Sequence, residues 1–87
     1  IDQGASKALK SGKSLLPAGI IKISGDFKKG DNIVIVDNNN IHIARALSSF
    51  TSEEINKIKG LQSNQIENIL GYASKSEIVH KDDIVIL

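Results

Sequence analysis

The stretch Gly12-Lys13-Ser14-Leu15-Leu16-Pro17-Ala18-Gly19-Ile20 organises this chain. It joins a short helical pattern to the first clear strand pattern, and it holds the only proline and two of the seven glycines. Proline fixes φ and lacks an amide donor, and glycine permits backbone angles that other residues resist. We therefore interpret residues 12–20 as a connector of defined shape and call them the connector.

Length and composition indicate one small domain. The 87 residues contain no cysteine and only three aromatic side chains, so no disulfide framework and no thiolate metal site is expected. No apolar run approaches the roughly 20 residues of a membrane helix, and no secretory leader is recognisable. We expect a soluble, cytoplasmic domain covering residues 1–87. Because the chain begins with Ile1 rather than Met, we also expect it to be part of a longer protein.

The residues before the connector predict a short helix. Ala5, Ala8 and Leu9 recur at the spacing of one helix face, and lysines lie on the outward side. Asp2 is the expected N-cap and Gly12 the expected C′ glycine.

Five segments beyond the helix have strand character: residues 20–23, 33–36, 41–49, 77–80 and 84–87. Residues 33–36 are apolar at every position, which predicts a central strand covered on both faces. The asparagines that follow favour a turn into an antiparallel partner. Arg45 shares its face of that partner with apolar residues, so it needs a partner group, a bulge or a strand end.

Two further short helices are expected between the third and fourth strands. Thr51 and Glu54 form a capping-box pattern that opens a helix ending at Gly60. A second helix, capped by Ser63 or Asn64, ends at Gly71, and both helices would cover one end of a sheet. The predicted fold class is mostly β with short helices, a small mixed sheet curled toward a barrel.

The charges are unevenly distributed although the net charge is only +1. Residues 1–30 carry six lysines against two aspartates, whereas residues 31–87 carry five cations against eight acids. Such a basic third can bind an anion such as RNA, or it can simply be a solvated, lysine-rich surface. With only three aromatics, base stacking on single strands is poorly supported, and contacts to the backbone of structured RNA stay open.

No set of residues has the pattern of a catalytic or metal site. Gly12-Lys13-Ser14 resembles the end of a phosphate-binding loop, but the required earlier glycine is replaced by Lys7. His42 and His80 each stand alone in a strand pattern, and Ser14 has no nearby base. We predict no catalytic residue and no metal ligand, and interpret the chain itself as a binding or regulatory module rather than an enzyme.

A set of short motifs runs in one order over nearly the whole chain. These are Gly4-Ala5, Ala8-Leu9, the connector, Gly25-Asp26-Phe27, Gly30-Asp31, Ala44-Arg45, Leu47, Ser52, Ile66-Glu67, Ile69-Leu70-Gly71-Tyr72, and Val79-His80 with Asp82. In this order the chain resembles the C-terminal PUA domains of bacterial glutamate 5-kinases. The connector alone is similar to PUA domains in general, and residues 66–72 point to the kinase.

The resemblance implies a pseudo-barrel of about five to six mixed strands flanked by short helices. A first strand would lead into Ile1 and Asp2, behind an N-terminal amino-acid-kinase domain absent from these 87 residues. The parent enzyme would use ATP and Mg²⁺ to phosphorylate the γ-carboxylate of glutamate, the first step of proline biosynthesis. It would be a homo-oligomer, commonly inhibited by proline, and its catalytic residues would all lie in the kinase domain.

PUA domains that bind RNA use the first helix, the connector and a neighbouring strand. Transferred by motif, that surface comprises Lys7, Lys10, Lys13, Ser14, Leu16, Pro17, Gly19 and, more loosely, Arg45. One departure weighs against it, because Ala46 stands where these kinases usually have glycine, and its methyl group can narrow a close approach. Two functional hypotheses therefore remain, an accessory, regulatory domain of the kinase or an RNA-binding module, beside a domain that serves only stability.

Overall fold

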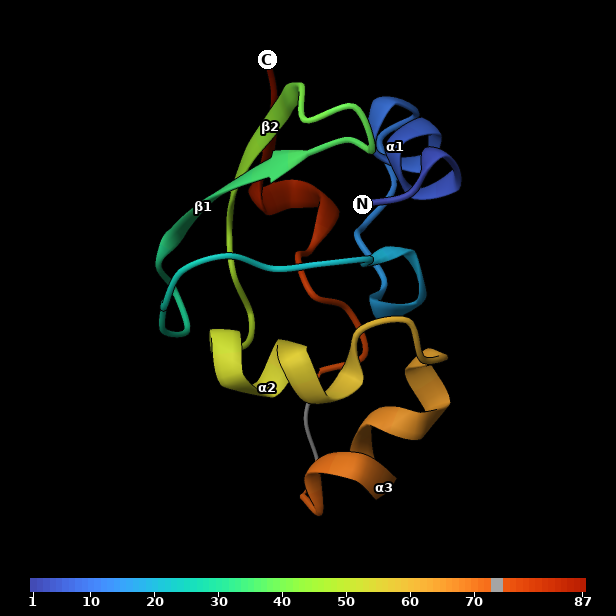
Figure 1. Cartoon of the computed structure of the whole chain (residues 1–87), viewed down its shortest axis with the longest axis vertical. Coiled ribbons are helices and arrows are strands. Elements are labelled where there is room, and N and C mark those ends of the chain that lie inside the picture. The colour runs from blue at the N-terminus through green and yellow to red at the C-terminus, as the bar shows by residue number, and fades with distance from the viewer. Residues whose placement is uncertain (73–74) are drawn as a thin grey trace.

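The computed structural model describes residues 1–72 and 75–87. Within these residues the structure has three short α-helices, three strands and three 3₁₀ turns, in a molecule of 34 × 23 × 23 Å (Figure 1). In chain order the elements are α1 (Gln3–Lys10), η1 (Pro17–Gly19), β1 (Asn32–Val36), β2 (His42–Leu47), α2 (Ser52–Ile58), η2 (Ser63–Gln65), α3 (Ile66–Leu70), η3 (Lys81–Asp83) and β3 (Ile84–Ile86).

The strands form one antiparallel sheet in the order β1-β2-β3. Val34, Arg45 and Val85 lie opposite one another across the three strands, and the β1–β2 register shifts after Ile35. All three of these side chains are exposed, so Arg45 lies on the open face of the sheet. Because this face is exposed, the charged Arg45 side chain stays in contact with solvent and needs no buried partner group.

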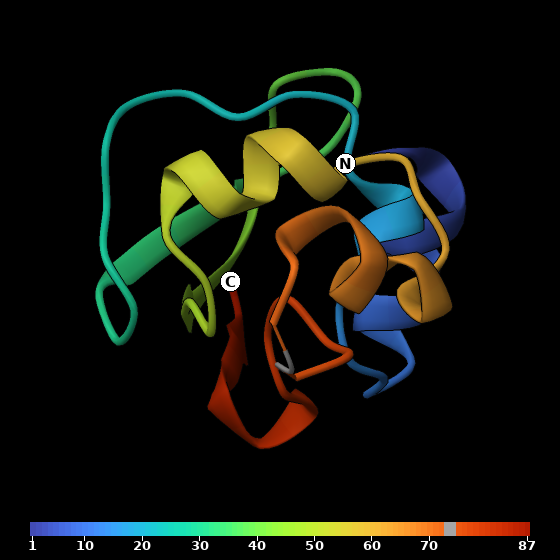
Figure 2. The same cartoon turned by 90° about the horizontal axis from the view of Figure 1, so that it is seen from below.

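The core lies on the other face of the sheet. Ile35, Ala44 and Ala46 are buried there, in one cluster with apolar residues of α1, α2, α3 and the connector. Phe50 has the largest of the fully buried side chains. The helices α2 and α3 lie at one end of the molecule and α1 lies beside the β1–β2 turn (Figures 1 and 2).

The caps predicted for α1 and α2 and the glycine predicted to end α3 are confirmed. The predicted cap of α3 by Ser63 or Asn64 is wrong, because both residues lie in η2 and the N-cap of α3 is Gln65, whose side chain makes no capping hydrogen bond. The Asp2 carboxylate accepts a hydrogen bond of 2.7 Å from the amide of Ala5, which begins α1. Thr51 and Glu54 form both hydrogen bonds of a capping box at α2. Gly71 ends α3 with a left-handed φ of 81°. These signals are local in sequence, which is why they could be recognised in advance.

The strand prediction is only partly confirmed, because the described residues form three strands rather than five or six. Residues 20–23 are extended but belong to no ladder, and residues 77–80 contribute an isolated bridge between Leu15 and Val79. The prediction that residues 33–36 form a central strand covered on both faces is wrong. β1 is an edge strand, and Val34 exposes 42 % of its surface.

The connector holds the separate parts of the molecule through backbone hydrogen bonds. Leu15 donates to Val79 over 3.0 Å and accepts from Ile78 over 2.8 Å, which fixes the C-terminal segment. The carbonyl of Pro17 accepts a bond of 2.7 Å from the amide of Gly60, just after α2. These bonds link segments distant in sequence through one short stretch.

Gly19 is the point where the connector touches α1. Its carbonyl accepts a bond of 2.9 Å from the amide of Asp2, and a Cβ atom built on Gly19 would lie 2.4 Å from the Cβ of Ala5. Real Cβ atoms do not approach so closely, so only glycine fits here unless the helix moves.

Replacing Gly19 with alanine should therefore destabilise the domain by about 1–3 kcal/mol, the usual range for overpacking. Denaturant unfolding measures this loss. The double variant Gly19→Ala with Ala5→Gly should recover most of it, because it removes the opposing methyl group. Gly4→Ala is the matched control, since its added Cβ would meet only the Asp2 carboxylate at 3.6 Å. A loss in Gly4→Ala equal to that in Gly19→Ala would contradict the steric explanation.

Glu54 ties the two C-terminal helices together. Its carboxylate accepts one hydrogen bond of 2.8 Å from the amide of Thr51 and another from the hydroxyl of Tyr72, which follows α3. Burial raises the pKa of the Glu54 carboxyl, but these hydrogen bonds outweigh burial and the pKa is lowered from its ordinary value of 4.5. The hydrogen bond to Glu54 raises the pKa of the Tyr72 hydroxyl.

A carboxyl group whose pKa is lower in the folded than in the unfolded state stabilises the fold at pH values above its unfolded pKa. This stabilisation is lost as the pH falls through the folded pKa. The free energy of unfolding should therefore decrease as the pH falls below the ordinary value of 4.5. Glu54→Gln should lower the stability at pH 7 and flatten this decrease. Urea unfolding between pH 7 and pH 3 tests both, with Glu53→Gln as the exposed neighbouring control. An unchanged slope in Glu54→Gln would refute the assignment.

Candidate functional site

An open groove of about 630 Å³ runs between α1, the connector and the segment 77–81. We call it the connector groove. Residues from both ends of the chain line it, among them Lys13, Ser14 and Leu16 from the connector and Glu77, His80 and Lys81 from the C-terminal segment.

Two hydrogen bonds position the C-terminal wall of this groove. The hydroxyl of Ser14 accepts a hydrogen bond of 2.9 Å from the amide of Lys81, 67 residues later in the chain. The Nδ1 atom of His80 accepts a bond of 3.1 Å from the amide of Asp82 and thereby caps η3. Ser14 and His80 therefore have structural hydrogen bonds that account for both side chains.

The structure brings together some of the residues predicted to bind RNA and separates others. Lys13, Ser14, Leu16 and Gly19 line the connector groove. Lys7 and Lys10 are exposed on α1 but outside its lining. The side chain of Pro17 is fully buried, so it supports the connector from inside.

Arg45 belongs to a different surface. It lies on the open face of the sheet between Val34 and Val85, and it is not among the residues that line the connector groove. The motif assigned Arg45 to this surface only loosely, as part of a neighbouring strand. Arg45 does lie on a strand, β2, where its neighbours are exposed apolar side chains.

The charge lining the connector groove is mixed. Its lining includes two cations, Lys13 and Lys81, and two anions, Asp2 and Glu77. The Asp2 carboxylate already accepts a hydrogen bond from the amide of Ala5. The hydrogen bond from the Ile41 amide is the main cause that lowers the pKa of the Asp37 carboxyl in the β1–β2 turn. The Lys10 charge lowers this pKa further, which places Lys10 near the turn. Of the lysines predicted to bind RNA, only Lys13 lines the groove itself.

Lys81 and Glu77 are groove residues that sequence reasoning missed. These two residues reach the groove only because Leu15 pairs with Val79 and Ser14 bonds to Lys81. Each of these contacts joins residues more than sixty positions apart. No local spacing signals such a pair. Only the motif order of a related fold can suggest it.

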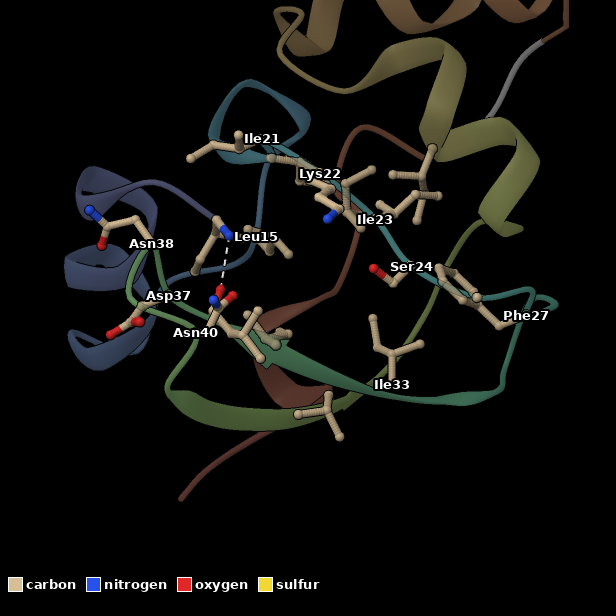
Figure 3. Close-up of a pocket in the computed structure, with 18 of the residues that line it drawn as sticks. Leu15, Ile21, Lys22, Ile23, Ser24, Phe27, Ile33, Asp37, Asn38 and Asn40 are labelled. Carbon is tan, nitrogen blue, oxygen red and sulfur yellow. Dashed lines mark hydrogen bonds between the residues drawn. The ribbon is translucent and has the colours of Figure 1, made fainter.

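A second opening of about 620 Å³ lies between β1 and the extended segment 20–27, and we call it the β1 slot. Figure 3 shows Ile23, Ser24 and Phe27 along one wall and Ile33 along the other. Ile55 and Ile78 also line it, so part of its lining is apolar core. At its far end the amino group of Ile1 donates a bond of 2.9 Å to the carbonyl of Val36.

Neither opening contains a constellation for catalysis. Within residues 1–72 and 75–87, no three His, Cys, Asp or Glu side chains are grouped to hold a metal ion. His42 is exposed on β2, far along the chain from His80, which caps η3. No helix in the described part of the chain is long and apolar enough to cross a membrane.

Comparison with known proteins gives consistent matches along the whole chain. Glutamate 5-kinase of Pelagibacter ubique is 62 % identical over 85 residues, which cover 98 % of this chain and 23 % of the relative. Glutamate 5-kinase of Thermoanaerobacter sp. strain X514 is 50 % identical over 88 residues, and that of Aquifex aeolicus is 44 % identical over 86 residues. The chain spans about a quarter, 24 %, of the length of the last two relatives, at their C-terminal end.

The PUA domain family matches residues 1–70, which include α1, the connector and the whole β1–β2 hairpin. This match covers most of the chain, and it agrees with the fold of a small sheet flanked by short helices. The chain belongs to the PUA domain family.

Proposed function

We propose that this chain is the C-terminal accessory domain of a glutamate 5-kinase and that it acts on the enzyme through domain contacts. The observation that carries the proposal is the alignment of the whole chain with the C-terminal part of such kinases, at up to 62 % identity among those compared. The lack of a catalytic constellation in the described residues is compatible with an accessory role.

The parent enzyme would then contain an N-terminal amino-acid-kinase domain. It would use ATP, with Mg²⁺, to phosphorylate the γ-carboxylate of glutamate in proline biosynthesis, as a cytoplasmic homo-oligomer. Its catalytic groups would lie outside residues 1–87, and the PUA domain would influence regulation or assembly.

Deleting residues 1–87 from the full-length enzyme should leave glutamate phosphorylation intact and change at least one regulatory property. The properties to measure are inhibition by proline, dependence on Mg²⁺ and oligomeric state. The Gly19→Ala variant of the full enzyme is the companion test, because it weakens the domain without removing it. If all three properties were unchanged in both proteins, the accessory role would be refuted.

A second function, binding of structured RNA, is favoured by one specific observation. Lys13 and Lys81 stand on the connector groove, and Lys7 and Lys10 project from the adjacent helix α1. Phosphate contacts from such side chains provide affinity without sequence specificity. The carboxylates of Asp2 and Glu77 in the same groove oppose it.

If the connector groove binds RNA, the isolated domain should bind a pool of structured cellular RNA with a strong salt dependence. Four phosphate contacts predict a slope of roughly −3 to −4 in log K against log salt. The variant Lys7→Ala, Lys10→Ala, Lys13→Ala should lose binding. The control Lys28→Ala, Lys29→Ala, Lys57→Ala removes the same charge from other exposed sites and should bind normally. Equal loss in both variants would indicate unspecific attraction only.

A further inference from the structure

The solvent side of the sheet carries aliphatic side chains where antiparallel sheets usually carry polar ones. Val34, Leu47 and Val85 are exposed to 42 %, 41 % and 65 %, and Leu87, two residues after Val85, is exposed to 62 %. A sheet with one solvated face normally alternates apolar residues inside with polar residues outside. Single exposed aliphatic side chains are ordinary, but a contiguous patch marks a contact site. We call these four residues, with Arg45, the open sheet face.

The side chains of the open sheet face adjoin one another across all three strands. Val34 and Val85 lie directly opposite Arg45, one on each side. Opposed residues of antiparallel strands have Cβ atoms about 5 Å apart. Leu47 is two residues from Arg45 along β2, so it projects from the same side of the sheet. The face is therefore one continuous aliphatic surface with a guanidinium group at its centre.

Arg45 has no partner for its charge. Within residues 1–72 and 75–87 its guanidinium makes no hydrogen bond and no ion pair. Asp31 and Asp83 directly precede β1 and β3, yet neither pairs with Arg45. A planar guanidinium binds a carboxylate through two hydrogen bonds, and this pair is strongest where neighbouring side chains exclude water. The open sheet face therefore matches a surface with an aspartate or glutamate at the centre of an apolar patch.

The position of Arg45 disfavours two other occupants. A two-fold contact between copies of this domain would use the same patch on both sides. Arg45 of each copy would then face its counterpart, and like charges across an interface repel. Structured RNA is also a poor match, because aliphatic side chains provide neither a positive charge for phosphates nor a platform for stacked bases. The charge pattern favours a protein surface with an acidic centre.

The parent chain would bring such a surface within reach. The aligned residues are the C-terminal 23 % of the Pelagibacter relative, so about three quarters of such a protein precedes the residue equivalent to Ile1. The amino nitrogen of Ile1 donates a bond of 2.9 Å to the carbonyl of Val36, so the preceding chain enters at the β1 edge of the sheet. A tethered partner has a high effective concentration, so a small patch is sufficient to hold it.

We propose that the open sheet face docks on the part of the parent chain that precedes Ile1. Arg45 would pair there with an aspartate or glutamate, and the four aliphatic side chains would pack around the pair. The proposal rests on the proposed function, and it names the surface through which the domain contacts would act. None of the five residues lines the connector groove, which would stay open.

Hydroxyl-radical footprinting of the full-length parent protein tests the docking, because it reports the exposure of individual side chains. Arg45→Glu should raise the oxidation of Val85 and Leu87 at least about threefold, because a carboxylate that faces the acidic partner opens the contact. Ile69, exposed to 48 % on α3, is the internal reference and should not change. Lys57→Glu is the matched charge reversal at an exposed site of α2 and should behave as the wild type. Equal oxidation of Val85 and Leu87 in the wild type and in Arg45→Glu would overturn the proposal.

Arg45→Lys offers an independent measurement that keeps the positive charge. Carbodiimide coupling joins an amine to a carboxylate in direct contact with it, and mass spectrometry identifies both residues. In the full-length protein the new amine should couple to an aspartate or glutamate that precedes Ile1. Reversing the charge of that acid together with Arg45→Glu should restore the low oxidation of Val85. Coupling only to Asp31 or Asp83, within this chain, would refute the docking.

Other occupants would give different results in the same experiments. In a mixture of isotope-labelled and unlabelled protein, a coupling product that joins two copies would overturn the proposal. Protection of Val85 that appears only when structured RNA is added would also overturn it. Footprinting reads the contact, whereas the deletion experiment reads kinase regulation. The contact can therefore be refuted while the accessory function stands, and a contact that forms although the deletion has no effect would refute the accessory function alone.

Discussion

The structure depends on the backbone hydrogen bonds of the connector. Leu15 pairs with the C-terminal segment, Pro17 accepts the amide that follows α2, and Gly19 accepts the amide that precedes α1. A core of this size buries little surface, so such a domain is only marginally stable. Fixing three distant segments through one short stretch limits how far each can move. The tight contact of Gly19 with Ala5 makes the geometry of that stretch sensitive to a single methyl group.

The two openings of the domain differ in what they can bind. The connector groove is open and carries charges of both signs, which suits a reversible contact with a polar partner. The β1 slot is lined largely by apolar residues, and residues 21–26 along one of its sides make no backbone hydrogen bond within the described part of the chain.

Local features of the fold could be predicted from the sequence, and pairings between distant segments could not. The caps formed by Asp2 and Thr51 depend on residues within three positions, and both were identified. The strand character of residues 20–23 was also recognised, but a strand needs a neighbour, and these residues have none in the sheet. The apolar run 33–36 suggested a central strand because its length and composition do not reveal whether a second neighbour is present. For the groove, the motif order identified Lys13 and Ser14, whereas Lys81 depended on long-range pairing.

The central claim is that the connector holds the domain together as one unit. Native-state hydrogen exchange of the amides of Leu15, Gly60 and Ile78 in the isolated domain tests it most directly, since each of these amides takes part in a connector bond. The account predicts that all three exchange with the same free energy of opening, equal to that of global unfolding. If the amide of Gly60 exchanged through a local opening while Leu15 and Ile78 stayed protected, the connector would not act as a single unit and the account would be contradicted.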